Sequence, residues 1–210
     1  LSEDFIRGVD ISSYVSVTKS GATYKDADGT GLSNAEFFTL LKNSGVNYVR
    51  IRVWNDPYDA DKNGYGGGNN DLEKAKTIGK LATDAGMKVL IDFHYSDWWA
   101  DPSRQLAPKE WKDMTLAEKE TALYNYTKDS LTELFAAGVD VAMVQVGNET
   151  NNGIAGVSRN TDGWEAMCKL FSAGSKAVRE AAETQNKEIQ VALHFTDPQT
   201  KNWYNEVAAA

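Results

Sequence analysis

The sequence predicts an α/β fold in which strands and helices alternate along one chain. Three observations support this prediction: short apolar segments, amphipathic stretches between them, and a glycine just before several of the apolar segments. Alternation of this kind joins parallel strands through crossover helices, so we expect βαβ units and a parallel sheet. The five predicted strands are rich in β-branched residues and comprise Phe5–Ile11, Asn47–Val53, Lys88–Phe93, Val141–Val146 and Ile189–Phe195.

Helix starts are marked by capping residues. Ser33 with Glu36, and Thr115 with Glu118, have the spacing of a capping box, in which each side chain accepts from the other residue's backbone. Weaker start signals are Asp162 with Glu165, and Asp197 followed by Pro198. Glycines that end helices in the left-handed conformation are expected at Gly45, Gly86 and Gly138.

The positions of polar residues favour a barrel over a doubly wound sheet. The first strand-to-helix turn, Gly8–Ser13, lacks the glycine fingerprint of a dinucleotide-binding fold. Polar and aromatic residues instead follow every predicted strand, which is where a (β/α)8 TIM barrel carries its active site. We therefore predict an α/β fold of the (β/α)8 TIM barrel type.

The chain is short for a whole barrel of this kind. Five βα units occupy all 210 residues, whereas a complete barrel typically needs about 250. We expect residues 1–210 to be the N-terminal part of a single (β/α)8 domain, truncated before strands six to eight. An open sheet of five strands would also expose strand edges and an apolar flank.

Composition narrows the function classes. A net charge of −8 disfavours nucleic acid and anionic lipid, which are bound by clusters of Lys and Arg. No apolar run approaches the roughly 18 residues of a membrane span, and the first residues lack a signal-peptide core. The single cysteine, Cys168, excludes an internal disulfide, and two histidines leave little for a histidine-rich metal site. Six tryptophans and nine tyrosines suit stacking on a neutral sugar, although such residues also pack cores.

The strongest chemical signal follows the fourth predicted strand. Asn148 and Glu149 place an amide and a carboxylic acid at a strand end. Glycoside hydrolysis commonly uses two carboxyl groups, one of which protonates the leaving oxygen. The alternative is a polar turn after a buried strand.

Two other segments could contribute to the same site. The segment Asp92–Trp99 combines acids, a histidine and aromatics around a strand end, which suits a sugar platform or an aromatic core cluster. Arg50 and Arg52 share one face of a strand. An arginine directed into a barrel needs a carboxylate partner, so one of them could orient a catalytic acid.

The loop after the second predicted strand has competing interpretations. Asp59–Gly64 matches the opening of a calcium-binding EF-hand loop, but Asn70 stands where a bidentate Glu is expected. Gly64–Gly68 lacks the Gly-Lys-Ser/Thr ending of a phosphate-binding loop. We favour a glycine-rich surface loop from which Tyr65 could reach a substrate.

Several motifs together resemble one enzyme family. The motifs are Val49–Pro57, Gly64–Lys74, Asp92–Pro102, Val144–Thr150 and Val191–Thr196. They resemble glycoside hydrolase family 53, and in particular its bacterial arabinogalactan endo-β-1,4-galactanases, over essentially the whole chain.

The resemblance implies a (β/α)8 barrel of the retaining-glycosidase clan A. It implies endo-hydrolysis of β-1,4-galactan, the side chains of pectic type I arabinogalactan, with Glu149 as general acid/base. It implies that substrate-binding residues include Asn148, Arg50, His94, Trp54, Asp56, Tyr95, Asp97, Trp98 and His194.

The resemblance also implies what this chain would lack. The family's nucleophilic Glu ends strand seven, and bacterial relatives carry a structural calcium in the following loop. Both lie beyond the predicted strands, so we expect no cofactor or metal within this chain and an isolated chain that is inactive or nearly so. The expected partners are β-1,4-galactan or galacto-oligosaccharide and the missing C-terminal half of the barrel, in an extracellular setting.

Three alternatives remain open from the sequence. One is a clan relative that acts on another plant β-glycan, such as mannan or cellulose. Another is a carbohydrate-binding protein without catalysis. The third is a metabolic barrel that binds phosphate after strands seven and eight, although the acidic charge and the tryptophan-rich strand ends disfavour it.

Overall fold

A five-stranded parallel sheet forms the centre of the molecule. The computed structural model describes residues 2, 5–197, 199 and 203–209. The strand order is β1-β2-β3-β4-β7, and every pairing is parallel. The strands are β1 (Gly8–Asp10), β2 (Tyr48–Val53), β3 (Lys88–Phe93), β4 (Val141–Val146) and β7 (Gln190–Ala192). The predicted parallel α/β arrangement is therefore confirmed.

The two outer strands are shorter than the sequence predicts. β1 covers three residues of the predicted Phe5–Ile11, and β7 covers three of Ile189–Phe195. Among the described residues, β1 pairs with β2 alone and β7 with β4 alone. A strand ends where its ladder ends, so the apolar pattern extends beyond the paired segment at both edges.

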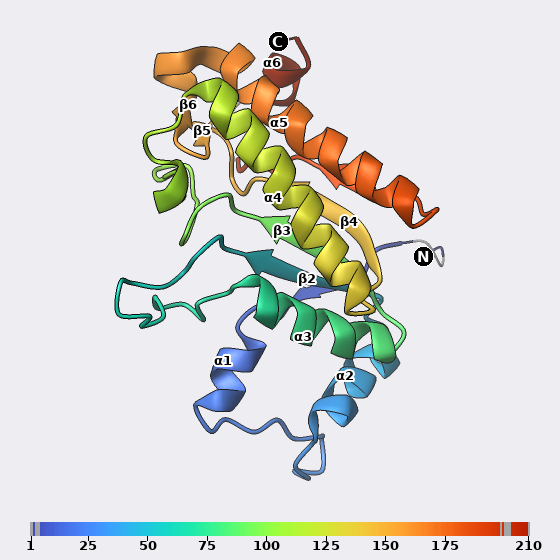
Figure 1. The fold of residues 1–210 in the computed structure, drawn as a ribbon. Coiled ribbons are helices and arrows are strands. Elements are labelled where there is room, and N and C mark those ends of the chain that lie inside the picture. Colours follow the sequence, from blue (N-terminus) through green and yellow to red (C-terminus); the bar gives the residue numbers. More distant parts are fainter. Residues whose placement is uncertain (1, 3–4, 198, 200–202, 210) are drawn as a thin grey trace.

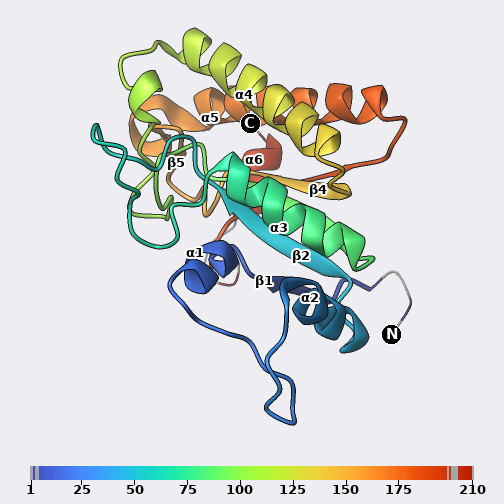
Figure 2. The same cartoon turned by 60° about the horizontal axis from the view of Figure 1, so that its bottom comes forward.

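Helices cover one face of this sheet. Figures 1 and 2 show α3, α4 and α5 on that face, with α4 and α5 side by side in both views. The loops after β2 and β3 gather at one end of the sheet, away from the N-terminus (Figure 1). The other elements are α1 (Tyr14–Lys19), α2 (Asn34–Asn43), α3 (Leu72–Asp84), a short 3₁₀ helix (Lys109–Trp111), α4 (Leu116–Ala136), the hairpin of β5 (Gly153–Ile154) and β6 (Val157–Ser158), α5 (Arg159–Thr184) and α6 (Trp203–Ala209).

Most of the predicted helix boundaries are confirmed. Reciprocal capping boxes form at the starts of α2 and α4, from Ser33 with Glu36 and from Thr115 with Glu118. The glycines that follow α2, α3 and α4 have φ of 93°, 79° and 77°, as expected for left-handed helix ends; they are Gly45, Gly86 and Gly138.

The start predicted at Asp162 falls at a break within α5, because Gly163 has a non-helical φ of 81° and ψ of 170° and a second helical segment follows it. Helix α5 begins earlier, at Arg159, and the Ser158 hydroxyl accepts from the backbone N–H of Asn160. The Asp162 carboxylate accepts from the backbone N–H of Ser158 instead of capping a later start. The predicted start at Asp197 and Pro198 involves Pro198, which lies outside the described residues.

The two faces of the sheet differ in polarity. Val49, Ile51 and Val53 of β2 are at most 1% exposed and belong to the apolar core with residues of β3 and β4. Alternation along a strand places Arg50 and Arg52 on the opposite face. The charged residues of the central strands therefore lie on the polar face of the sheet and at the strand ends.

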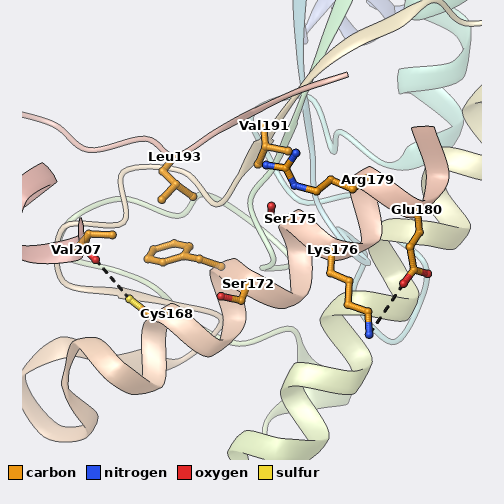
Figure 3. Close-up of a pocket in the computed structure, with 10 residues that line it drawn as sticks. Cys168, Ser172, Ser175, Lys176, Arg179, Glu180, Val191, Leu193 and Val207 are labelled. Atoms are coloured by element: carbon orange, nitrogen blue, oxygen red, sulfur yellow. Dashed lines mark hydrogen bonds and ion pairs between the residues drawn. The ribbon is translucent and has the colours of Figure 1, made fainter. Parts of the chain in front are cut away.

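An apolar groove of about 720 Å³ lies beside the outer strand β7 (Figure 3). Its apolar lining comes from Phe171 of α5, Val191 of β7, Leu193 just after β7 and Val207 of α6, and Lys176 lies at its rim. This groove matches the apolar flank expected of an open sheet. No helix of the described chain is both long enough and apolar enough to cross a bilayer.

Candidate active site

Arg50 forms the centre of a polar network on the open face of the sheet. Strand register places Arg50 opposite Asp10 of β1. Its Nη1 lies 2.7 Å from Asp10 Oδ2, and its Nη2 lies 2.7 Å from Asp92 Oδ2 and 3.0 Å from Asn148 Oδ1. Gln145 Oε1 also accepts from Arg50, at 3.3 Å. Arg50 thus contacts residues of β1, β3, β4 and the turn after β4. The expected carboxylate partners of a strand arginine are confirmed.

Asp92 is fully buried and accepts hydrogen bonds from three side chains. Besides Arg50, it accepts from Gln145 Nε2 at 2.7 Å and from His94 Nε2 at 3.1 Å. A buried carboxylate needs this number of partners because burial otherwise disfavours its charge. Asp92 therefore holds Arg50, Gln145 and His94 in fixed positions.

His94 is fixed in one tautomer by its neighbours. The indole N–H of Trp54 and the backbone N–H of Ala100 both donate to His94 Nδ1, at 3.2 and 3.1 Å. Because Nδ1 accepts from both, the ring hydrogen lies on Nε2 and points to Asp92. The Trp54 side chain is fully buried, so it positions His94 instead of presenting a face to a ligand.

Asp10 and Arg52 extend the network toward β1. Burial would raise the pKa of the Asp10 carboxyl, but hydrogen bonds from Ser12 and the Arg50 charge lower it below its usual value. Arg52 Nη1 lies 3.8 Å from Asp10 Oδ1, and its guanidinium lies 4.3 Å from the ring centre of Trp99. Both Asp10 oxygens are thus engaged by arginine.

Glu149 lies in a constrained turn after β4. Gly147 and Glu149 have φ of 84° and 49°, and positive φ in a non-glycine residue costs energy that the surroundings must supply. Gln105 Nε2 donates to the backbone carbonyls of Asn148 at 2.8 Å and Glu149 at 3.1 Å. The Glu149 carboxylate itself is half-buried and has no hydrogen bond or ion pair to the described part of the chain. The turn is rigid while its carboxylate is available to a ligand.

His194 lies directly beside this turn. Its Nδ1 is 3.1 Å from the backbone nitrogen of Glu149 and 3.0 Å from Asn148 Oδ1. An unprotonated Nδ1 accepts from Glu149, whereas a protonated Nδ1 donates to Asn148. Burial, followed by the nearby Arg50 charge, lowers the pKa of His194 below its usual value.

Asp56, Asp97 and Lys109 form a separate cluster. The Asp97 carboxylate accepts the backbone N–H groups of Asp56 and Lys109, at 3.0 and 2.8 Å, and Lys109 Nζ lies 2.8 Å from Asp56 Oδ2. Burial raises the pKa of Asp97 despite those donors. No hydrogen bond within the described residues joins these two acids to the Arg50 network.

Tyr95 lies away from the network as well. Its side chain is fully buried, and its hydroxyl bonds with Thr127 Oγ1 at 2.8 Å. The prediction that Tyr95 contacts substrate does not fit this position, because the chain turns at Tyr95 with φ of 50° and directs the ring into the core. Trp98, by contrast, is 39% exposed at the strand-end surface.

Gln145 and Gln105 were missed by sequence reasoning. Gln145 is a polar residue within the apolar run of β4, which is a usable signal. Gln105 lies in an irregular loop and carries no such signal. The Asp59 carboxylate accepts backbone N–H groups of Asp61 and Asn63 and so closes a turn. No group of three or more His, Cys, Asp or Glu among the described residues is placed to hold a metal.

Comparisons with known proteins identify relatives of this chain. A family model described as glycosyl hydrolase family 53 matches residues 6–210. An endo-beta-1,4-galactanase of Bacillus subtilis is 52% identical over 208 residues, which are 99% of this chain and 46% of that protein. An arabinogalactan endo-beta-1,4-galactanase of Cellvibrio japonicus is 36% identical over 95% of this chain and 52% of that protein.

Solved structures show the same fold. The family 53 catalytic domain of Ignisphaera aggregans matches all of this chain and 56% of that chain, with a TM-score of 0.90 and 37% identity. A fungal beta-1,4-galactanase structure matches with a TM-score of 0.82 and 30% identity, over 96% of this chain and 58% of that chain. The chain therefore spans about half the length of the relatives it matches. Its parallel sheet is consistent with part of a (β/α)8 barrel, and the chain belongs to glycoside hydrolase family 53.

Proposed function

We propose that the protein hydrolyses internal bonds of β-1,4-galactan with Glu149 as general acid/base. The observation that carries this proposal is the Glu149 carboxylate, free of protein partners in the described chain, on a turn held by Gln105 and His194. In a retaining mechanism such a group protonates the leaving glycosidic oxygen. It then removes a proton from the water that hydrolyses the glycosyl–enzyme intermediate.

The surrounding residues suit recognition of a neutral sugar. The Asn148 amide oxygen accepts from Arg50 at 3.0 Å and its nitrogen donates to the carbonyl of Ala100 at 2.8 Å. These bonds hold the amide in one orientation and leave one N–H to donate to a sugar hydroxyl. The hydrogen bonds from His94 to Asp92 and from Trp54 to His94 hold the end of β3 rigid as well. Preorganised donors and acceptors of this kind favour one substrate geometry.

We propose that the nucleophile lies outside this chain. A retaining enzyme needs a second carboxylate about 5–5.5 Å from the first. Asp92 is fully buried and has three donors, and Asp10 is engaged by two arginines and Ser12. Asp56 and Asp97 belong to the Lys109 cluster. With these carboxylates committed to structural contacts, the isolated chain should show little or no hydrolysis.

The partner that this proposal requires is the remainder of a barrel. The groove beside β7 (Figure 3) and the one-sided pairing of β1 and β7 support such a partner, because both leave apolar surface or strand edge to be covered. We place the activity outside the cell, because a polymeric galactan is too large to import readily. Pectic type I arabinogalactan is the natural source of that polymer.

The test compares the chain with a chimera. In the chimera, this chain replaces the matched 208 residues of the Bacillus subtilis relative. Reducing-sugar release from linear β-1,4-galactan should be absent with the chain alone and present with the chimera. Glu149→Gln in the chimera should lower the rate by roughly 10²–10⁴-fold.

Two outcomes would redirect the proposal. Release by the chain alone that vanishes in Glu149→Gln would place the second carboxylate within these residues. A chimera that binds galactan, fails to cleave it, and binds equally well as Glu149→Gln would indicate a carbohydrate-binding protein. A panel with mannan and cellulose distinguishes galactan from other plant β-glycans.

A further inference from the structure

The chain contains two Asn-Gly pairs, and the fold places them in different environments. Asn63-Gly64 lies in the loop after β2, which projects from the end of the sheet (Figure 1), whereas Asn152-Gly153 enters the β5–β6 hairpin. An asparagine side chain loses its amide most readily before glycine, because no Cβ hinders the attacking backbone nitrogen. The surroundings that the fold gives each pair therefore decide which of the two reacts.

The backbone around Asn63 leaves the attacking nitrogen unrestrained. Asn63 and Gly64 are both exposed. The loop closes through an antiparallel bridge between Tyr58 and Gly64, and the hydrogen bonds of this bridge come from the residues on either side. The backbone N–H of Gly64 has no hydrogen bond to the part of the chain that the structure describes.

The Asn63 side chain is restrained by one exposed hydrogen bond. Its Nδ2 donates to Asp59 Oδ2 at 3.0 Å, and its Oδ1 has no protein partner among the described residues. Water can therefore solvate Oδ1 while negative charge develops on it. A bond between exposed groups is readily exchanged for bonds to water, so the side chain can rotate toward the Gly64 nitrogen at little cost.

The Asn152 side chain is held through both of its polar atoms. Its Nδ2 donates to the carbonyl of Pro102 at 2.8 Å, and its Oδ1 accepts from Arg159 Nη2 at 3.2 Å. Gly153 is buried, and a Cβ there would lie 2.6 Å from the carbonyl oxygen of Val157. Cyclisation at Asn152 therefore has to break two side-chain hydrogen bonds within a packed hairpin.

We propose that Asn63 is the site at which this protein deamidates spontaneously, and that the fold protects Asn152. The Gly64 backbone nitrogen attacks Asn63 Cγ and forms a new C–N bond, and the side-chain amide leaves as ammonia together with the Gly64 amide proton. Water then opens the resulting succinimide at either carbonyl, which yields aspartate or isoaspartate at position 63. Water is the only co-reactant, and the inference does not depend on the proposed function.

The modification opens the loop after β2. Both products remove the donor to Asp59 and place a second carboxylate beside it. Isoaspartate also lengthens the backbone within the bridge between Tyr58 and Gly64. The neighbouring bond from the Tyr65 N–H to the Pro57 carbonyl, which is 2.8 Å long, is then lost.

Peptide mapping of the 210-residue chain tests the assignment after incubation in mildly alkaline buffer. Mass spectrometry locates the gain of about one dalton, and chromatography separates aspartate from isoaspartate. Asn63 should react at least about tenfold faster than Asn152, because the side-chain hydrogen bonds of Asn152 add to its barrier. Asn63→Gln should abolish the reaction at position 63 and leave the rate at Asn152 unchanged, since glutamine has to close a larger ring.

Two controls separate the effect of the fold from that of the local sequence. In concentrated urea the two sites should react at similar rates, because the reacting dipeptide is the same. Arg159→Met should accelerate the reaction at Asn152 and leave Asn63 unaffected. Equal rates in the folded chain, or a rate difference that persists in urea, would overturn the proposal. In the deamidated fraction the Tyr65 amide should exchange faster with solvent, and unchanged exchange would contradict the opening of the loop.

Discussion

Replacing Arg50 with methionine tests whether its network holds the site together. Arg50→Met keeps most of the aliphatic stem and removes the charge that pairs with Asp10 and Asp92. Asp92 is fully buried, so it cannot recover the lost partner from bulk water. The variant should fold with a lower free energy of unfolding.

The magnitude follows from how much of the pair is buried. Removing one partner of a fully buried ion pair costs about 3–5 kcal/mol. The Arg50 side chain is 30% exposed, and Asp92 keeps donors from Gln145 and His94, so both effects reduce the loss. A hydrogen bond to a charged group contributes about 1.5–3 kcal/mol, and we expect a loss of about 2–3 kcal/mol for Arg50→Met.

Urea unfolding of the 210-residue chain measures this loss. Lys187→Met is the matched control, because Lys187 pairs with Asp140 at 2.8 Å while both side chains are over 40% exposed. The control should lose less than about 1 kcal/mol. The double variant Arg50→Met, Asp92→Asn should be more stable than the sum of the single losses predicts, by about 1 kcal/mol or more. Equal losses for Arg50→Met and the control, with additive double-variant behaviour, would refute the reasoning.

Three further predictions concern the turn, the histidine and the buried tyrosine. Gly147→Ala should lower the free energy of unfolding by about 2 kcal/mol or more, because its φ is 84° and a Cβ would lie 2.5 Å from Thr150 Cγ2; an unchanged urea midpoint would contradict the assigned turn. The pKa of His194 is lowered on folding, so the neutral ring stabilises the fold above the ordinary histidine pKa of about 6.5, and the free energy of unfolding falls as pH drops below that value. His194→Gln should flatten this pH dependence. An unchanged dependence in urea titrations would contradict the prediction. Tyr95→Phe should cost about 1 kcal/mol through its lost bond to Thr127 and leave galactohexaose affinity unchanged, which calorimetry checks.

The alternating strands and helices could be predicted because their signals are local. Capping boxes at Ser33 and Thr115 depend on residues three apart, and glycine helix ends depend on a single residue. The start of α5 could not be placed in this way. The Ser158 hydroxyl caps the first turn of α5, which packs with the β5–β6 hairpin, and Gly163 breaks the helix next to the predicted start at Asp162.

The candidate site was predictable at the strand ends and less so elsewhere. Arg50 could be assigned to a carboxylate-binding role because a charged residue within a parallel strand needs a partner. The position of the Tyr95 ring depends on the positive φ of Tyr95 itself, which turns the ring from the strand end into the core. Gln105 contacts the Glu149 turn from an irregular loop, and no periodic sequence pattern predicts such a contact.

The leaving-group dependence of the chimera tests the role of Glu149 most directly. A general acid matters when the leaving oxygen needs a proton, and it matters little for an aryl galactoside with a good leaving group. Glu149→Ala in the chimera should slow galactan hydrolysis by roughly 10²–10⁴-fold. It should leave the first step on a dinitrophenyl β-galactoside, the transfer of the glycosyl group to the enzyme, nearly unchanged. That step is measured as a burst of dinitrophenolate. Equal slowing of the burst and of galactan hydrolysis would contradict the assignment of Glu149 as the proton donor.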